Sequence, residues 1–321
     1  MTQTQAPKKD FSLPSIIKWL GQKGYSQGVF WIILVALTSN MNDILMRIAG
    51  VNIPPQEVTF FRYFFATLTL FPVMLIIGKK SFYTKRPSLH IIRSLLLFGA
   101  MSCWTKGLTM SPLSTGSILA QTTQLFVLIM AYVFLKEPVG WQRTLATIAG
   151  FTGVLIIALG DAGPEGFIES FLSMNNATLF FLAAAMMFAL SDIINKRFVV
   201  DESTLSMMFY IAVGTMLIAL YPAILVWKTP TLKDLVYLLI LGAGGNLILF
   251  FLLKAFAATD VSALSPFRYV EILSAVILGY LIFSEAPTFW TLAGAGIIIP
   301  STFAISKYET RQQQKKRQEE S

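Results

Sequence analysis

The chain reads Asn42-Asp43-Ile44-Leu45-Met46-Arg47 in one apolar run, and later Ser191-Asp192-Ile193-Ile194-Asn195-Lys196 in another. A second pair of segments matches at nearly the same spacing of about 148 residues, because Lys106-Gly107-Leu108 has its counterpart in Lys254-Ala255-Phe256. A unit that occurs twice in one chain indicates an internal repeat. In hydrophobic chains, two such halves are typical of secondary transporters, which hold their site at the interface between the halves.

The composition is that of a membrane protein. Hydrophobic residues make up 55% of the 321 and charged residues 13%, and the mean hydropathy of +0.65 is too high for a soluble domain. A helix needs about 20 apolar residues to cross a bilayer. We expect ten such spans, five in each half, at 29–47, 57–78, 89–109, 116–135, 141–159, 177–196, 205–227, 233–253, 260–283 and 289–306.

Lys and Arg are spread unevenly over the loops between these spans. With the N-terminus inside, they gather in the cytosolic segments, whereas the outer loops keep Lys228 and Lys233. By the positive-inside rule, both termini are cytosolic, which predicts an all-α integral membrane protein with a 5+5 inverted repeat. We expect a cytosolic leader or interfacial helix at 1–28, the first repeat at 29–159, an external loop at 160–176, the second repeat at 177–306 and a basic cytosolic tail at 307–321.

Several functional classes find no support in the sequence. A phosphate-binding loop, an HExxH motif and a GxSxG motif are all missing, and His90 and Cys103 are the single residues of their types. The net charge of +8 is divided among several segments, unlike a nucleic-acid-binding face. We therefore expect a membrane carrier, monomer or homodimer, with no enzymatic activity, cofactor, metal site or nucleic-acid partner.

Charged residues within the spans are the first candidates for a substrate site. A charge at the middle of a membrane helix costs about 2.5–3.5 kcal/mol, so it usually faces a cavity or a partner. Asp43 and Asp192 occupy equivalent repeat positions, and Asn42 adds polarity beside the first. Each aspartate also precedes a basic residue by four positions, Arg47 or Lys196, so a local ion pair is an equal alternative.

The ninth span carries the densest group of candidate residues. Arg268 and Glu271 are three positions apart, with aromatic Phe267 and Tyr269 on either side of the arginine. Pro266 frees a backbone carbonyl one turn earlier, as discontinuous transporter helices do around a cavity. The alternative is a proline-kinked helix in which the two charges form an internal salt bridge.

Further polar and aromatic candidates lie in other spans. Arg62 lies inside the second span and would pair with an acid or with a substrate carboxylate. Lys106 and Lys254 either face a cavity from matched repeat positions or extend to the interface. Trp104 offers a surface for stacking on a planar or cationic ligand. Gln121 begins a polar run that suggests a cavity wall in the fourth span.

The pattern as a whole resembles the drug/metabolite transporter superfamily, EamA type. Glu137 and Glu285, which we interpret as loop and packing features, each precede a Gly-rich span. Several segments are more similar to the S-adenosylmethionine transporters of obligate intracellular bacteria such as rickettsiae. They are NDI (42–44), EVTFFR (57–62), RSLLLF (93–98), SCWTKGLT (102–109), DIINKRFV (192–199), NLILFFLLKAF (246–256) and PFRYVE (266–271).

This resemblance implies import of S-adenosylmethionine, in exchange for S-adenosylhomocysteine, by alternating access around a midplane cavity. Such a ligand requires an acid for its cationic groups, aromatic surface for its adenine and a base for its carboxylate. Three acids, three aromatic residues and two arginines named above meet these needs. The alternatives are proton-coupled transport of an amino acid or another small metabolite, in either direction, and a non-transporting membrane assembly protein.

Overall fold

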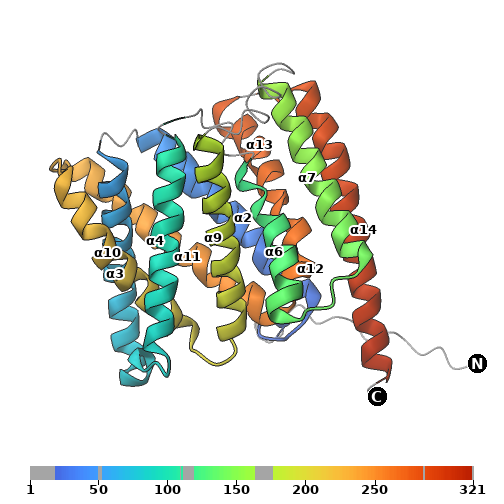
Figure 1. The fold of residues 1–321 in the computed structure, drawn as a ribbon, viewed down its shortest axis with the longest axis horizontal. Coiled ribbons are helices and arrows are strands. Elements are labelled where there is room, and N and C mark those ends of the chain that lie inside the picture. Colours follow the sequence, from blue (N-terminus) through green and yellow to red (C-terminus); the bar gives the residue numbers. More distant parts are fainter. Residues whose placement is uncertain are drawn as a thin grey trace, which may run out of the picture.

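The computed structural model describes residues 19–49, 53–108, 110, 119–162, 176–284 and 286–319, and this part of the chain folds into a bundle of helices (Figure 1). Their bounds are α2 Tyr25–Ala49, α3 Pro55–Ile77, η1 Lys79–Phe82, α4 Pro87–Leu108, α6 Thr123–Met130, η2 Ala131–Leu135, α7 Trp141–Ala162, α9 Asn176–Phe198, α10 Thr204–Leu225, α11 Leu232–Ala258, α12 Val261–Arg268, α13 Val270–Phe283 and α14 Phe289–Glu319.

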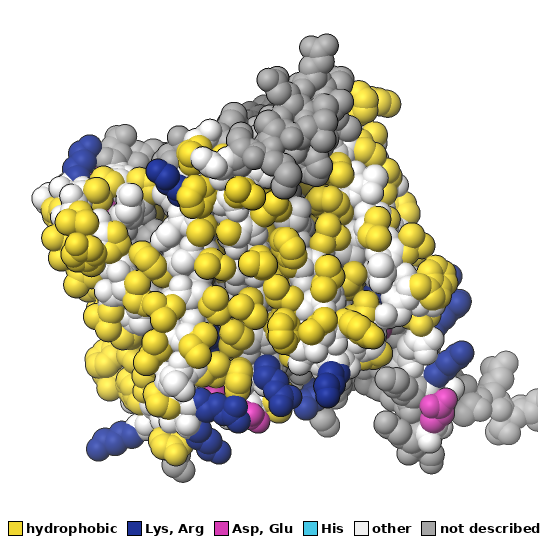
Figure 2. Space-filling view, viewed as in Figure 1, with side chains coloured by type: hydrophobic (Ala, Val, Ile, Leu, Met, Phe, Trp, Pro, Cys, Tyr) yellow, Lys and Arg dark blue, Asp and Glu magenta, His cyan; other side chains and the backbone are white. Residues whose placement is uncertain are grey.

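The bundle has the surface of a membrane protein. Within the described residues, seven segments are long and apolar enough to cross a bilayer, namely α2, α3, α9, α10, α11, α12 with α13, and α14. Side chains that face outward are hydrophobic over most of the height of the bundle, while Lys and Arg gather along its lower edge (Figure 2). The helices α4 and α7 have 22 residues each. The expected fourth span is covered from Thr123 by α6 and η2.

The two ends of the bundle differ in their chemistry. At the lower end in Figure 1, which we call the Arg143 end, α2, α4, α7, α10 and α12 begin and α14 ends. The opposite end, where α4 finishes, we call the Lys106 end. The largest hydrophobic core lies toward the Arg143 end, with Tyr25, Met207, Phe256 and Val261 all at most 3% exposed. Apolar packing therefore closes the bundle at the Arg143 end.

The helices associate in close pairs: α2 with α11, α4 with α9, α3 with α10, and α7 with α14. In Figure 1, α7 and α14 stand side by side at one edge, and α3 and α10 stand at the other. Lys136 and Ser284, which are 148 positions apart, both take the left-handed conformation, with φ of 54° and 58°. They end η2 and α13 in the same way.

Two helices differ from the expected spans. The ninth span is broken at Tyr269, three residues after Pro266, into α12 and α13. Proline cannot donate a backbone hydrogen bond and its ring disturbs the preceding turn, which accounts for a break near this point. The helix α14 continues to Glu319, so the segment that we expected to be a separate tail is helical. Gln, Lys, Arg and Glu in that segment all favour helix.

Gly242 allows α11 to approach the backbone of α3. A Cβ atom at this position would lie 2.7 Å from the Arg62 carbonyl oxygen and 2.8 Å from the Ala66 nitrogen. Overpacking of this kind usually costs about 1–3 kcal/mol. We expect Gly242→Ala to lower the unfolding temperature in detergent. Gly296→Ala is the matched control, because a Cβ there meets no atom within 4 Å. Equal unfolding temperatures for the two variants would contradict the close approach of α11 to the α3 backbone.

Candidate functional site

A cavity of about 390 Å³ lies at the centre of the bundle, between α3, α4, α6, α9, α10, α11 and the α12–α13 break. Its size falls in the usual range for small-molecule sites, about 300–1,000 Å³. Four charged side chains line it, two basic and two acidic: Arg62, Arg268, Asp192 and Glu271. Four amide side chains join them, namely Gln121, Gln124, Asn195 and Asn246. The cavity is therefore built for a ligand that carries both signs of charge.

An ion pair crosses the cavity from α9 to α12. The Arg268 Nη1 atom donates to Asp192 Oδ2 at 3.2 Å, and these side chains are 23% and 10% exposed. Lys196, the expected local partner of Asp192, instead donates to the backbone oxygens of Phe256 and Thr259, each at 2.7 Å. The ion pair of Arg268 thus reaches another helix, whereas the alternative from sequence was a salt bridge to Glu271 within its own helix.

The backbone next to Glu271 is held by α2. The Asn40 Nδ2 atom donates to the Glu271 carbonyl oxygen at 2.8 Å and to Ser274 Oγ at 2.6 Å. Asn40 is 6% exposed, so these bonds lie in the interior. They fix the first turn of α13 against α2, and with it the position of Glu271 at the cavity wall.

Two of the amides also tie neighbouring helices together. The Asn195 Oδ1 atom accepts from Nε of the fully buried Arg93 at 2.9 Å. The Asn246 Nδ2 atom donates to the Ala66 carbonyl oxygen at 2.8 Å and to Thr69 Oγ1 at 2.9 Å. These side chains were not among the residues expected at the site. The signal in the sequence was a single asparagine within a long apolar run for Asn246, and an asparagine three positions after Asp192 for Asn195.

The aromatic wall of the cavity is formed by Tyr63 and Phe188, neither of which was among the residues expected at the site. The three aromatic residues expected there lie elsewhere. Trp104 packs edge-on against Phe181 with ring centroids 5.3 Å apart, and Phe267 packs against Tyr25 at 6.1 Å. Tyr269 is fully buried in a cluster with Val154, Ile157 and Ile298 of α7 and α14. These three residues stabilise helix packing instead.

The remaining expected residues lie outside the central cavity. Asn42 is buried between α2 and α11, with Nδ2 3.4 Å from the Leu241 carbonyl oxygen. Asp43 follows it on α2 and is not among the lining residues. The Lys254 ammonium lies over the Phe250 ring, 5.5 Å from its centroid. The side chain of Arg47, the expected partner of Asp43, lies outside the part that the structure describes.

Lys106 lines a second cavity of about 350 Å³ toward the Lys106 end. Gln56, Thr59, Ser102 and Thr105 line the same space. Met101 lines this cavity and the central one, so the two adjoin at its side chain. Phe98 and Pro222 also line the second cavity, so this space between the centre and the Lys106 end has both polar and apolar walls.

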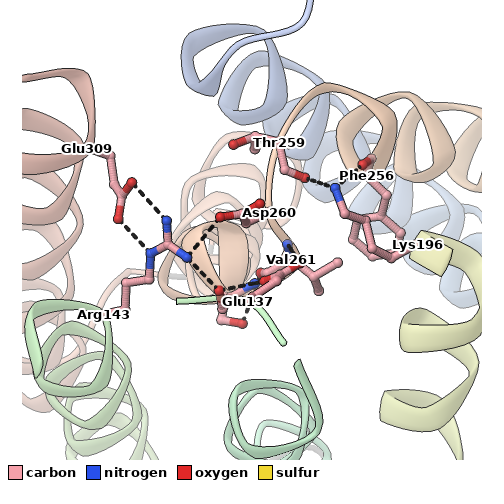
Figure 3. A network of polar contacts seen from close by, with 10 residues as sticks. Glu137, Arg143, Lys196, Phe256, Thr259, Asp260, Val261 and Glu309 are labelled. Atoms are coloured by element: carbon pink, nitrogen blue, oxygen red, sulfur yellow. Dashed lines mark hydrogen bonds and ion pairs between the residues drawn. The ribbon is translucent and has the colours of Figure 1, made fainter. Parts of the chain in front are cut away.

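At the Arg143 end, a polar network fastens the start of α12 (Figure 3). Glu137 accepts from the Val261 and Ser262 backbone nitrogens, both at 3.0 Å, and from Ser262 Oγ at 2.6 Å. A carboxylate at a helix N-terminus satisfies unpaired N–H groups and is favoured by the helix dipole. Glu137 was interpreted as a loop and packing residue, and the structure gives it this capping role. Its counterpart Glu285 lies outside the described residues.

Arg143 is the centre of the same network. Its guanidinium makes two bonds to Glu309, at 2.6 and 3.0 Å, one to Asp260 at 3.1 Å and one to Ser262 Oγ at 2.8 Å. The side chains of Arg143 and Glu309 are both 10% exposed. Figure 3 shows the arginine between α14 on one side and the start of α12 on the other. The network therefore joins residues from both halves of the sequence in a nearly dry setting.

Comparison with known proteins agrees with this architecture. The EamA-like transporter family matches residues 26–159 and again 175–307. The chain is 43% identical to the S-adenosylmethionine uptake transporter of Rickettsia bellii and 42% identical to that of Rickettsia conorii. Each match covers 92% of this chain. It covers 98% of the Rickettsia bellii protein and 97% of the Rickettsia conorii protein.

More distant proteins share the same extent. A riboflavin transporter of Vibrio cholerae is 27% identical over 91% of this chain and 96% of its own. One crystal structure superposes with a TM-score of 0.78 at 16% identity, over 90% of this chain and 99% of its own, a likeness of fold alone. Two family matches that together span most of the chain, with relatives above 40% identity, place it plainly: the chain belongs to the EamA-like transporter family.

Proposed function

We propose that this protein imports S-adenosylmethionine across the bacterial inner membrane and releases S-adenosylhomocysteine in exchange. The observation that carries the proposal is the central cavity, in which two acids, two arginines and two aromatic rings face the same space. The two rickettsial relatives support the choice of substrate, because their match extends over almost the whole of both proteins.

Each group of the ligand has a suitable partner in the cavity. The sulfonium and ammonium are cationic and suit Asp192 and Glu271, while Arg62 can hold the carboxylate. Tyr63 and Phe188 offer faces for the adenine and the sulfonium. Arg268 orients the Asp192 carboxylate by the bond at 3.2 Å. A neutral ligand such as riboflavin would offer no counter-charge to the four charged side chains of the cavity.

We propose the expected topology of ten spans in a 5+5 inverted repeat for the same protein. Exchanging the two halves converts the pair α2–α11 into α9–α4 and maps the pairs α3–α10 and α7–α14 onto themselves. The shared left-handed turn at Lys136 and Ser284 supports the same relation. Basic side chains along the lower edge in Figure 2 favour a cytosolic Arg143 end, which would place both termini inside.

Under this topology, the structure corresponds to a state closed toward the cytosol. The large core and the Arg143 network seal that end, and the second cavity leads from the centre toward the Lys106 end. Transport requires the opposite state as well, in which the bonds between Arg143 and α12 are broken. The network is thus the inner closure of an alternating-access cycle.

Uptake of labelled S-adenosylmethionine into proteoliposomes tests this proposal. We expect saturable uptake that rises several-fold when the vesicles are preloaded with S-adenosylhomocysteine. Because the two ligands differ by one charge, exchange moves net charge and should respond to an imposed membrane potential. Uptake that ignores the preload would retain the substrate and contradict exchange. No uptake by protein shown to be folded would contradict the substrate.

A further inference from the structure

Gln124 is the cavity residue whose hydrogen-bonding capacity is left unused. Among the described residues, six buried side-chain atoms have no hydrogen-bond partner, and one of them, the Gln124 Oε1 atom, belongs to a residue that lines the central cavity. Gln124 is 4% exposed and lies in the first turn of α6. A buried acceptor without a partner costs about 1–3 kcal/mol, which a bound ligand with an N–H group would recover.

The carboxamide has a specific complement among the groups of the proposed substrate. It offers one acceptor and two donors in a plane. Adenine presents the matching edge, an exocyclic amine beside a ring nitrogen, and a glutamine side chain pairs with that edge through two hydrogen bonds. The ammonium and sulfonium do not need an amide, because the acids serve them. The unused amide therefore favours the base over the amino-acid end of the ligand.

The surroundings of Gln124 agree with a base-binding pocket. Tyr63 and Phe188 line the same cavity and offer aromatic faces. Gln121 lies three residues earlier, in the turn before α6, and also lines the cavity, so this turn and the start of α6 contribute the two glutamines. The charged groups Asp192 and Arg268 come from α9 and α12 instead. Gln124 and the Asp192–Arg268 ion pair are thus supplied by different helices.

We propose that Gln124 determines specificity for the base by accepting a hydrogen bond from the adenine amine at Oε1 and donating from Nε2 to the neighbouring ring nitrogen. This role rests on the proposed function, since it presumes an adenine-containing ligand in the central cavity. It adds a base-reading residue that distinguishes adenine from purines without the amine.

Binding of two ligands to the purified full chain tests the role: S-adenosylmethionine and its analogue whose purine lacks the 6-amino group. We expect wild-type protein to prefer the amine-bearing ligand about 10-fold or more, in line with the discrimination of a paired amide. Gln124→Leu should bring the two affinities to within about twofold. Gln124→Glu keeps an acceptor oxygen and should preserve a preference for the amine, which guards against a leucine variant that fails to fold.

Gln142→Leu is the matched control, because Gln142 lies on α7 outside the central cavity and should keep the wild-type preference. Equal affinities in the wild type, or a preference that survives in Gln124→Leu, would overturn the base-reading role and leave the substrate intact. Failure of folded wild-type protein to bind either ligand would refute the proposed substrate, and the role of Gln124 would fall with it.

Discussion

Asp192→Asn is expected to reduce the initial rate of S-adenosylmethionine uptake about 100-fold while leaving the protein folded. The substitution removes the acid that we propose as a partner of the ligand's cationic groups, and it leaves the Arg268 guanidinium, 3.2 Å away, without its counter-charge. Loss of one partner from a desolvated pair costs about 2–5 kcal/mol. Because about 1.4 kcal/mol is a factor of ten, this range includes the expected loss of about 100-fold. Uptake into proteoliposomes measures the loss of transport rate, and ligand binding in detergent measures the loss of affinity.

The chain contains a matched control for this substitution. Asp201 also pairs with an arginine, Arg86, but at 3.5 Å and with side chains that are 55% and 50% exposed. Exposed pairs contribute little, so Asp201→Asn should transport within about twofold of wild type. If Asp192→Asn behaves like Asp201→Asn, Asp192 is not a substrate-binding residue. If the variant simply failed to fold, the purified protein would lose its monodisperse fraction and its thermal unfolding transition.

Charged residues in the spans could be predicted as site candidates only in part, because Asp43, Lys106 and Lys254 were chosen on the same ground and do not line the central cavity. Arg62, Asp192, Arg268 and Glu271 stand in apolar runs where a charge is expensive, and the structure places all four around one cavity. The aromatic residues could not be chosen in this way. The chain has 26 Phe, and a helix that is apolar on every side gives no sign of which face meets the cavity.

The sequence also could not predict which residue on another helix each charged side chain contacts. Spacing of three or four residues favours local pairs, but the rotation of each helix is set by packing, and this directs Arg268 to α9 and Lys196 to the end of α11. The helical extension that carries Glu309 was expected as a tail, because polar composition alone does not show a partner such as Arg143. The capping role of Glu137 depends in the same way on three-dimensional neighbours.

The Arg143 network gives the second large expected effect. Arg143→Ala leaves Glu309, 10% exposed, without its two bonds and frees Asp260 and Ser262 from α7. Removing one partner of a buried pair costs about 3–5 kcal/mol. If the network closes the cytosolic end, that loss should fall mainly on the closed state. The variant is therefore expected to shift the population toward a state open at the Arg143 end.

Alkylation of a reporter cysteine measures the shift. With Cys103→Ser as background, Val261→Cys places a thiol at a position that is 2% exposed. The backbone nitrogen of this residue donates to Glu137, so the thiol lies next to the network. Arg143→Ala should raise its reaction with an impermeant maleimide from the cytosolic side at least tenfold, whereas Arg86→Ala, which breaks an exposed pair, should not. Retained S-adenosylmethionine binding separates opening from unfolding. Unchanged labelling in a variant that still binds would mean that these bonds stabilise the helices without closing the path, and that the seal is the apolar core alone.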